Sequence, residues 1–197
     1  MRQKFRYVLA LASAVLLTGC VTNSVLSELP FVSSINPRVS VLDKSMTITG
    51  PLGYCPDLQT VKEVDGSAHV LVGPCLTIGK VARAAIAISV GPPGSGAVMA
   101  EGGEALSDFF TSDQGRQTLS GRAKADDVEI LSAQSQDEMF LMHVYDAQTG
   151  ENWRAMLAAR GRLITIGINA NGLPAEDGLD LAAAAARAMK KANPQNG

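Results

Sequence analysis

The sequence predicts an α+β domain in which a mostly antiparallel sheet is covered by helices. Short runs rich in Val, Ile and Met recur along the chain with turn residues between them, which is typical of strands. Two other segments, 101–119 and 179–192, place apolar residues at helical spacing. The resulting order of strands, helix, strands and helix favours an α+β domain.

The first half of the chain is expected to be mainly strand. Apolar runs precede the turn pair Gly50-Pro51, and a further run leads into Cys75. The run 84–90 is apolar enough that we expect it to be buried on both faces of the sheet. The expected elements are short strands within 39–48, an irregular loop at 53–57, and strands at 69–73 and 84–90.

The second half is expected to contain two short helices, a strand meander and a final helix. Ser112 can cap the second helix, and Arg160-Gly161 suits a tight hairpin. The small face of residues 182–186 would let the Ala-rich final helix approach the sheet closely. The expected elements are helices at 101–110, 112–119 and 179–192 and strands at 128–134, 139–145, 152–159 and 162–168.

The amino terminus has the layout of a secretory signal. Arg2, Lys4 and Arg6 precede a short apolar run that ends in Leu17-Thr18-Gly19-Cys20. This run is too short to span a bilayer as a permanent helix. The segment resembles the lipobox signal of bacterial lipoproteins, the alternative being an ordinary signal peptide that holds a cysteine. The resemblance implies that residues 1–19 are a removed signal peptide and that Cys20 is lipidated.

The same resemblance implies a location and a division of the chain. We expect a cell-envelope protein that is attached to a membrane through the lipid on Cys20. Val21, where Asp would favour retention in some bacterial lineages, favours the outer membrane facing the periplasm. Residues 20–37 are then the lipidated Cys and a tether that Ser, Asn and Pro punctuate, and residues 38–197 form a single α+β domain.

The charge balance excludes some classes of partner. Residues 1–19 hold three of the 17 Lys and Arg residues and none of the 19 Asp and Glu residues, so the mature chain has a net charge near −5. Nucleic acids call for a basic patch, which such a composition does not favour. We therefore expect no nucleic-acid partner.

The number of cysteines is consistent with an exported protein. Once Cys20 carries lipid, Cys55 and Cys75 remain, and an even pair in an oxidising compartment predicts a disulfide. A metal pair and a redox-active pair are the alternatives. Neither is favoured, because the two cysteines are far apart and no histidine lies at ligand spacing.

The order of elements, together with the lipobox, resembles the PsbP-like α/β/α sandwich. The segment Gly53-Tyr54-Cys55-Pro56-Asp57, with Cys75 following 20 residues after Cys55, is also similar to a group of small bacterial lipoproteins of largely unknown function. The resemblance covers about residues 39–193. It implies a fold and little about activity.

A glycine-rich loop is a candidate for nucleotide binding. Residues 91–96 follow an apolar strand and have the glycine spacing of a phosphate-binding loop. The next positions are Ala97 and Val98, where that motif needs a Lys for the outer phosphates and a hydroxyl for magnesium. We therefore expect a mobile Gly/Pro loop, no nucleotide and no cofactor.

Candidate catalytic and metal-binding side chains are scarce. General acid–base or nucleophilic catalysis needs His, Cys or paired acids, and the two histidines, His69 and His143, lie in expected strands outside any motif. The acidic pairs 126–127 and 137–138 suit solvated turns and have no metal-ligand spacing. The sequence thus predicts no catalytic residue, no metal site and no enzyme.

The single tryptophan, Trp153, lies beside Arg154 in an expected strand. Lone tryptophans of small domains mostly lie in the core, but Trp and Arg are also frequent anchors at interfaces. The pair is therefore a candidate partner-binding site.

These observations favour a non-enzymatic, lipid-anchored protein that acts as an accessory or assembly factor for another envelope component. The alternative is a small-molecule or lipid carrier with an apolar pocket between sheet and helix. An exposed apolar patch around Trp153 would favour the first function. A deep cavity lined by Phe109, Met139, Phe140 and Met142 would favour the second.

Overall fold

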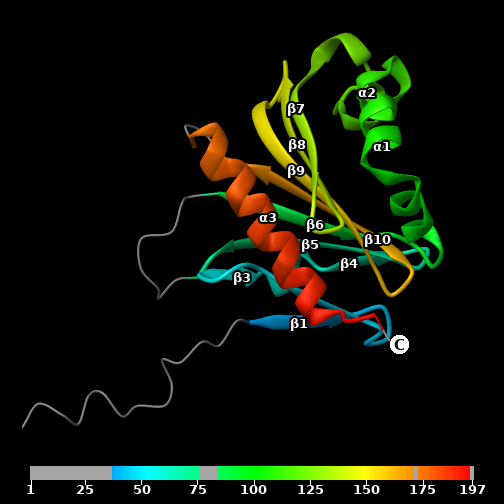
Figure 1. Ribbon diagram of the computed structural model, residues 1–197. Coiled ribbons are helices and arrows are strands. Elements are labelled where there is room, and N and C mark those ends of the chain that lie inside the picture. Colours follow the sequence, from blue (N-terminus) through cyan, green and yellow to red (C-terminus); the bar gives the residue numbers. More distant parts are fainter. Residues whose placement is uncertain (1–36, 76–83, 171–172, 196–197) are drawn as a thin grey trace, which may run out of the picture. The chain divides into compact units, whose positions relative to one another are not determined.

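The computed structural model describes residues 37–75, 84–170 and 173–195. It shows an antiparallel sheet with helix α3 on one face and helices α1 and α2 on the other (Figure 1). The predicted fold class, an α+β domain with an antiparallel sheet covered by helices, is confirmed. Cys20, the signal peptide 1–19 and the tether lie outside the described residues, apart from the last tether residue, Pro37.

In the described residues the sheet has eight strands, and its order is β3-β5-β6-β10-β9-β8-β7, with β4 also paired to β5. All pairings are antiparallel, and β7 to β10 form the predicted meander. The strands are β3 (Tyr54–Pro56), β4 (Lys62–Val64), β5 (Ser67–Pro74), β6 (Ala85–Val90), β7 (Val128–Gln136), β8 (Met139–Asp146), β9 (Gly150–Ala159) and β10 (Arg162–Asn169).

The other elements cover this sheet. A separate hairpin is made of β1 (Arg38–Val41) and β2 (Met46–Thr49). The α-helices are α1 (Gly102–Thr111), α2 (Asp113–Leu119) and α3 (Ala175–Ala192). The short 3₁₀ helices are η1 (Leu58–Thr60), η2 (Ser95–Glu101) and η3 (Ala125–Asp127). Ser112 caps α2 as predicted, since its hydroxyl accepts the backbone N–H of Gly115 at 3.2 Å.

The larger core lies between the sheet and α3. One cross-strand row, Val70, Ile88, Ile166, Ala155 and Leu141, runs through five neighbouring strands, and all of these residues are buried. The predicted small face of α3 packs on this side, because its alanines let the helix backbone approach the strands. Those buried alanines are Ala182, Ala183, Ala185 and Ala186.

A second, smaller core lies on the opposite face, and it occupies only part of that face. Leu106, Phe110 and Leu119 of α1 and α2 pack there against Phe140 and Met142 of β8. Together the two cores and the Cys55–Cys75 disulfide lie within the compact unit 36–197, so removing residues 1–35 takes nothing from either core.

Three expectations about elements are wrong. The segment at 53–57 is not an irregular loop, because Tyr54–Pro56 pairs with β5. The final helix begins one turn earlier than residue 179, at Ala175 after Pro174, and Glu176 and Asp177 lie in its first turn. The run 84–90 is not buried on both faces, since only alternate residues of β6 are buried.

The disulfide between Cys55 and Cys75 is confirmed, with the two Cα atoms 5.2 Å apart. It links β3 to the chain that leaves β5, and the backbone N–H of Cys75 donates to the carbonyl oxygen of Gly53 at 2.8 Å. Among the residues that the structure describes, no helix has the length and apolar character needed to cross a membrane.

Candidate functional site

The helices on the α1–α2 side leave half of their sheet face open. The row next to the buried one runs across the same strands as Leu71, Ala87, Gly167, Arg154 and Met142. Met142 is fully buried under the helices, whereas Leu71 is 41% exposed. The face is thus covered over β8 and progressively open toward β5.

Small side chains make the open part hollow. Ala85, Ala87 and Ser89 alternate with large buried residues along β6, and Thr165 and Gly167 do the same along β10. A Cβ atom built on Gly167 would meet nothing within 4 Å. The alternation of small and large residues is the sequence signal of this hollow, and it was missed because the run 84–90 is apolar enough to suggest burial on both faces.

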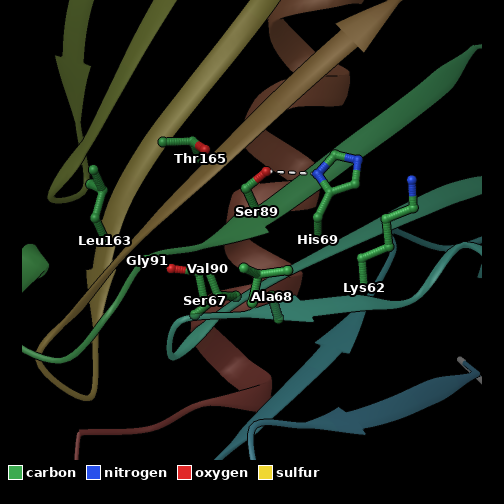
Figure 2. A pocket seen from close by; sticks show the side chains of 10 residues that line it. Lys62, Ser67, Ala68, His69, Ser89, Val90, Gly91, Leu163 and Thr165 are labelled. Carbon is green, nitrogen blue, oxygen red and sulfur yellow. Dashed lines mark hydrogen bonds between the residues drawn. The ribbon is translucent and has the colours of Figure 1, made fainter.

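A first pocket of about 450 Å³ lies at the β4–β5 side of this hollow (Figure 2). His69 and Ser89 are paired across β5 and β6, and the His69 Nδ1 and Ser89 Oγ atoms are 2.9 Å apart. These two polar side chains therefore bond each other. The pocket is lined by Lys62, Val64, Ser67, Ala68, His69, Ser89, Val90, Gly91, Leu163 and Thr165.

A second pocket of about 320 Å³ lies between the sheet and the helices. Phe110 of α1 and Leu119 of α2 form one wall, and Arg154 projects from the floor strand β9. It shares Ser89 and Thr165 with the first pocket, so the two join into one groove. The second pocket is lined by Ala87, Ser89, Phe110, Thr118, Leu119, Met142, Arg154, Ala155, Met156, Thr165, Ile166 and Gly167.

Arg154 is the half-buried cation of the groove. Its Nε donates to Asn152 Oδ1 and one Nη to the carbonyl oxygen of Leu119, both at 3.1 Å. Leu119 ends α2, so the guanidinium lies at the negative end of that helix. Burial lowers the pKa of Arg154, and the charge of Asp146 opposes this shift. Within the described parts of the chain, no carboxylate oxygen lies within 4.0 Å of the guanidinium.

The charges of the groove are of one sign. Lys62 and His69 line the first pocket and Arg154 the second, while no Asp or Glu is among the described residues that line either one. This contrasts with the net charge of −2 for the whole sequence. The groove is therefore an apolar trough with basic groups on both sides and no Asp or Glu in its described lining, and the charge of Asp146 acts on Arg154 from outside that lining.

The His69–Ser89 pair has the residue types of a base and a nucleophile, but its setting does not complete an active site. Both residues belong to central antiparallel strands, where backbone N–H groups bond neighbouring strands rather than a reacting oxygen. Since no carboxylate lines the described groove, none orients the imidazole from the other side. We therefore treat the pair as part of the groove floor.

The candidate pair Trp153 and Arg154 is divided between the two faces of the sheet. Trp153 is 1% exposed and belongs to the α3-side core, where its indole stacks on His143 with ring centroids 5.2 Å apart. Gly178 of α3 lies directly against the indole. Arg154 projects to the opposite face and lines the groove. The exposed apolar patch that would favour the accessory-factor function is therefore not at Trp153.

The groove is the cavity that a carrier needs, but only one of the four residues predicted to line it does so. Met139 and Phe140 are both buried in packed cores, on opposite faces of the sheet. Phe109 is 39% exposed and lies outside the groove. Met142 does line the groove, and Phe110 takes the place predicted for its neighbour.

The glycine-rich loop at 91–96 makes no phosphate cradle. The backbone N–H groups of Gly94 and Gly96 both donate to the carbonyl oxygen of Gly161, and that of Gly91 donates to Leu163. The Ser95 hydroxyl accepts the N–H of Leu163 at 2.9 Å. The loop, expected to be mobile, is thus tied to the β9–β10 hairpin by groups that a phosphate would need.

For metals, the described ranges contain no group of three or more His, Cys, Asp or Glu side chains placed to hold an ion. His143 instead pairs with Glu151, with Nε2 and Oε2 3.1 Å apart. Glu138, of the acidic pair 137–138, pairs with Lys190 of α3, which lowers the pKa of the glutamate through a hydrogen bond and charge attraction.

Comparisons with known proteins add little to this picture. No family model matches the chain, and no curated protein matches its sequence. Among solved structures, the chain is similar to a mutant of the protein Mog1, with 12% sequence identity and a TM-score of 0.39 over 79% of this chain and 91% of that one. A likeness of this size carries no functional conclusion, so the function has to be inferred from the groove.

Proposed function

We propose that this chain is a non-enzymatic, lipid-anchored protein of the cell envelope that binds another envelope component in the groove. The lipobox-like segment ending at Cys20 supports the anchor and the location. One observation supports the binding function: a sheet face that helices close over β8 but leave open and hollow over β5, β6 and β10. The groove has the size typical of ligand sites, about 300–1,000 Å³.

The first candidate for the bound component is a small apolar molecule or lipid, which makes the protein a carrier. The position of the second pocket favours it, because Phe110, Leu119 and Met142 surround a space between sheet and helix. This is the architecture that a carrier of apolar ligands needs. The polar side chains of His69 and Ser89 bond each other on the groove floor.

The second candidate is a protein partner, which makes the chain an accessory or assembly factor. The exposed leucine Leu71 and the exposed Val64, both on the open face beside the groove, favour it. Exposed apolar side chains that adjoin a hollow are typical of contact surfaces. The partner is then also an envelope component.

Photo-crosslinking in the native envelope tests the proposal. A photoreactive residue replaces Leu71, and in a matched control it replaces Leu131 of β7, which is exposed to nearly the same extent, 41% against 43%. We expect a discrete adduct from position 71 and none from position 131. An adduct of lipid mass supports the carrier, and a discrete protein adduct supports the accessory factor. Equal labelling at both positions, or none at 71, contradicts the proposal.

A further inference from the structure

We propose that the groove binds a single-chain anionic amphiphile, with its hydrocarbon chain along the open trough and its acidic headgroup at Arg154. This inference rests on the proposed binding function and specifies the ligand class. The headgroup is a carboxylate or a phosphate, as a free fatty acid or a lysophospholipid would supply.

The first observation is the shape and lining of the trough. Ala87, Gly167 and Thr165 form a floor without large side chains, next to the apolar wall of Phe110 and Leu119. Such a floor admits one alkyl chain lying in the groove. Each methylene that leaves water there raises affinity by roughly fourfold.

The second observation is the state of Arg154. Nε and one Nη are bonded to Asn152 and Leu119, and no hydrogen bond of the other Nη is found in the described residues. The guanidinium is half-buried at the boundary of the apolar pocket. A carboxylate or phosphate placed there would receive a charge-assisted hydrogen bond, which is stronger than a neutral one.

The third observation is the sign of the surrounding charge. Lys62 and His69 lie on the far side of the trough from Arg154, and no carboxylate is among the described residues that line it. A cationic amphiphile would be repelled by these basic groups, and a neutral one would gain only an ordinary hydrogen bond from Arg154. Charge complementarity therefore selects the anion.

Calorimetric titration of residues 36–197 tests the inference with three probes that share a twelve-carbon chain. Dodecanoate is the anion, dodecyl maltoside the neutral probe and dodecyltrimethylammonium the cation, each below its micelle concentration. We expect dodecanoate to bind at least about tenfold more tightly than the other two. Shortening dodecanoate to decanoate removes two methylenes and should weaken binding about 15-fold. Equal or stronger binding of the neutral or cationic probe overturns the inference.

Two variants locate the site. Ala87→Phe places a ring in the trough and should reduce dodecanoate affinity at least tenfold, whereas Gln134→Phe, an exposed position on strand β7, should leave it unchanged. Unchanged affinity in Ala87→Phe overturns the inference.

Charge variants address the headgroup. Arg154→Gln should abolish the preference for the anion, and Arg154→Lys should retain most of it. Because Arg154 also bonds the end of α2, the Lys variant and circular dichroism serve as controls that show whether the variants still fold. If both variants keep the preference for the anion, the headgroup assignment is overturned.

A final comparison separates this inference from the proposed function. Lauroyl lysophosphatidylglycerol and dodecanoate present the two sources of an anionic headgroup, and binding of either supports the ligand class. If neither binds while the photoreactive residue at position 71 still gives a discrete protein adduct, the inference fails and the binding function stands. If both experiments are negative, both fail.

Discussion

Asp146 shows how a single side chain closes a turn in this sheet. It ends β8, is 2% exposed, and its Oδ1 accepts the backbone N–H groups of Gln148 at 2.8 Å and Thr149 at 2.9 Å. Burial raises the pKa of this carboxyl, but the hydrogen bonds from Gln148, Thr149 and Gly121 outweigh burial and lower the pKa below its ordinary value of 3.8. The charged form is therefore the one that the folded chain prefers.

This preference predicts an acid-dependent part of the stability. Because the pKa is lower in the folded chain, Asp146 stabilises the fold fully above its ordinary value of 3.8, and the contribution is lost as the pH falls through the lower folded pKa. Asp146→Asn should reduce the free energy of unfolding by about 1–2 kcal/mol at pH 7. Urea unfolding between pH 7 and pH 2.5 measures this, with the exposed Asp126→Asn as control. An equal pH slope in wild type and Asp146→Asn contradicts it.

Gly178 decides where Trp153 can lie. A Cβ atom on Gly178 would come within 2.1 Å of the indole, whose own place in the core is fixed by β9 and His143. Gly178→Ala should therefore destabilise the fold by about 1–3 kcal/mol, although alanine is the better helix former. Gly73→Ala, where nothing lies within 4 Å, should change stability by less than about 1 kcal/mol. Thermal unfolding of both variants provides the measurement, and equal stabilities contradict the packing argument.

At the scale of elements, Asn193 joins the end of α3 to the β1–β2 hairpin. Its Oδ1 accepts the backbone N–H of Thr47 and its Nδ2 donates to the Thr47 carbonyl, both at 2.8 Å. Nδ2 also donates to the Met189 carbonyl at 2.9 Å. One buried amide thus satisfies the backbone of a strand that is 146 residues away in sequence.

Asn193→Ala should therefore loosen the hairpin. It leaves the backbone groups of Thr47 without partners at a half-buried position, which costs about 1–3 kcal/mol. Hydrogen exchange should become faster in β2 while β8 and β9 change only through the global stability. Asn169→Ala, at an exposed position at the end of β10, is the matched control. Unchanged exchange in β2 would show that the amide is not what holds the hairpin.

The elements that sequence analysis predicted correctly are those with strong local patterns. The β7–β10 meander and the Ser112 cap have such patterns, and each is present. The short strand β3 was missed because its three residues, the last of which is Pro56, carry no periodicity, and pairing with β5 decides their conformation. The start of α3 was missed because Gly178 argues against a helix locally, whereas its contact with Trp153 requires a glycine there.

At the scale of the whole molecule, the groove is a consequence of partial coverage, and the alternation of small and large residues along β6 does not show which part of the sheet face the helices leave open. Burial on both faces of β6 was expected from its apolar residues, but α1 and α2 pack over β8 and leave Ala87 and Ser89 half-buried. Arg154 was singled out beside Trp153, yet it is Arg154 alone that faces the groove. Which residue of such a pair is accessible depends on the side of the sheet that each helix covers.

The lipid anchor proposed at Cys20 would hold this groove at a membrane surface, and a Cys20 variant tests it. Cys20→Ala removes the thiol that the lipidating enzyme would use, so radiolabelled palmitate should no longer enter the protein. Because processing of bacterial lipoproteins follows lipidation, the variant should persist as a precursor that retains residues 1–19. Wild type should be labelled, cut before Cys20 and found in the membrane fraction. Intact mass and membrane fractionation of both forms provide the measurement.

A correctly cut, unlabelled wild-type product free of the membrane would show that the segment is an ordinary signal peptide. The groove would then act on components away from the membrane surface.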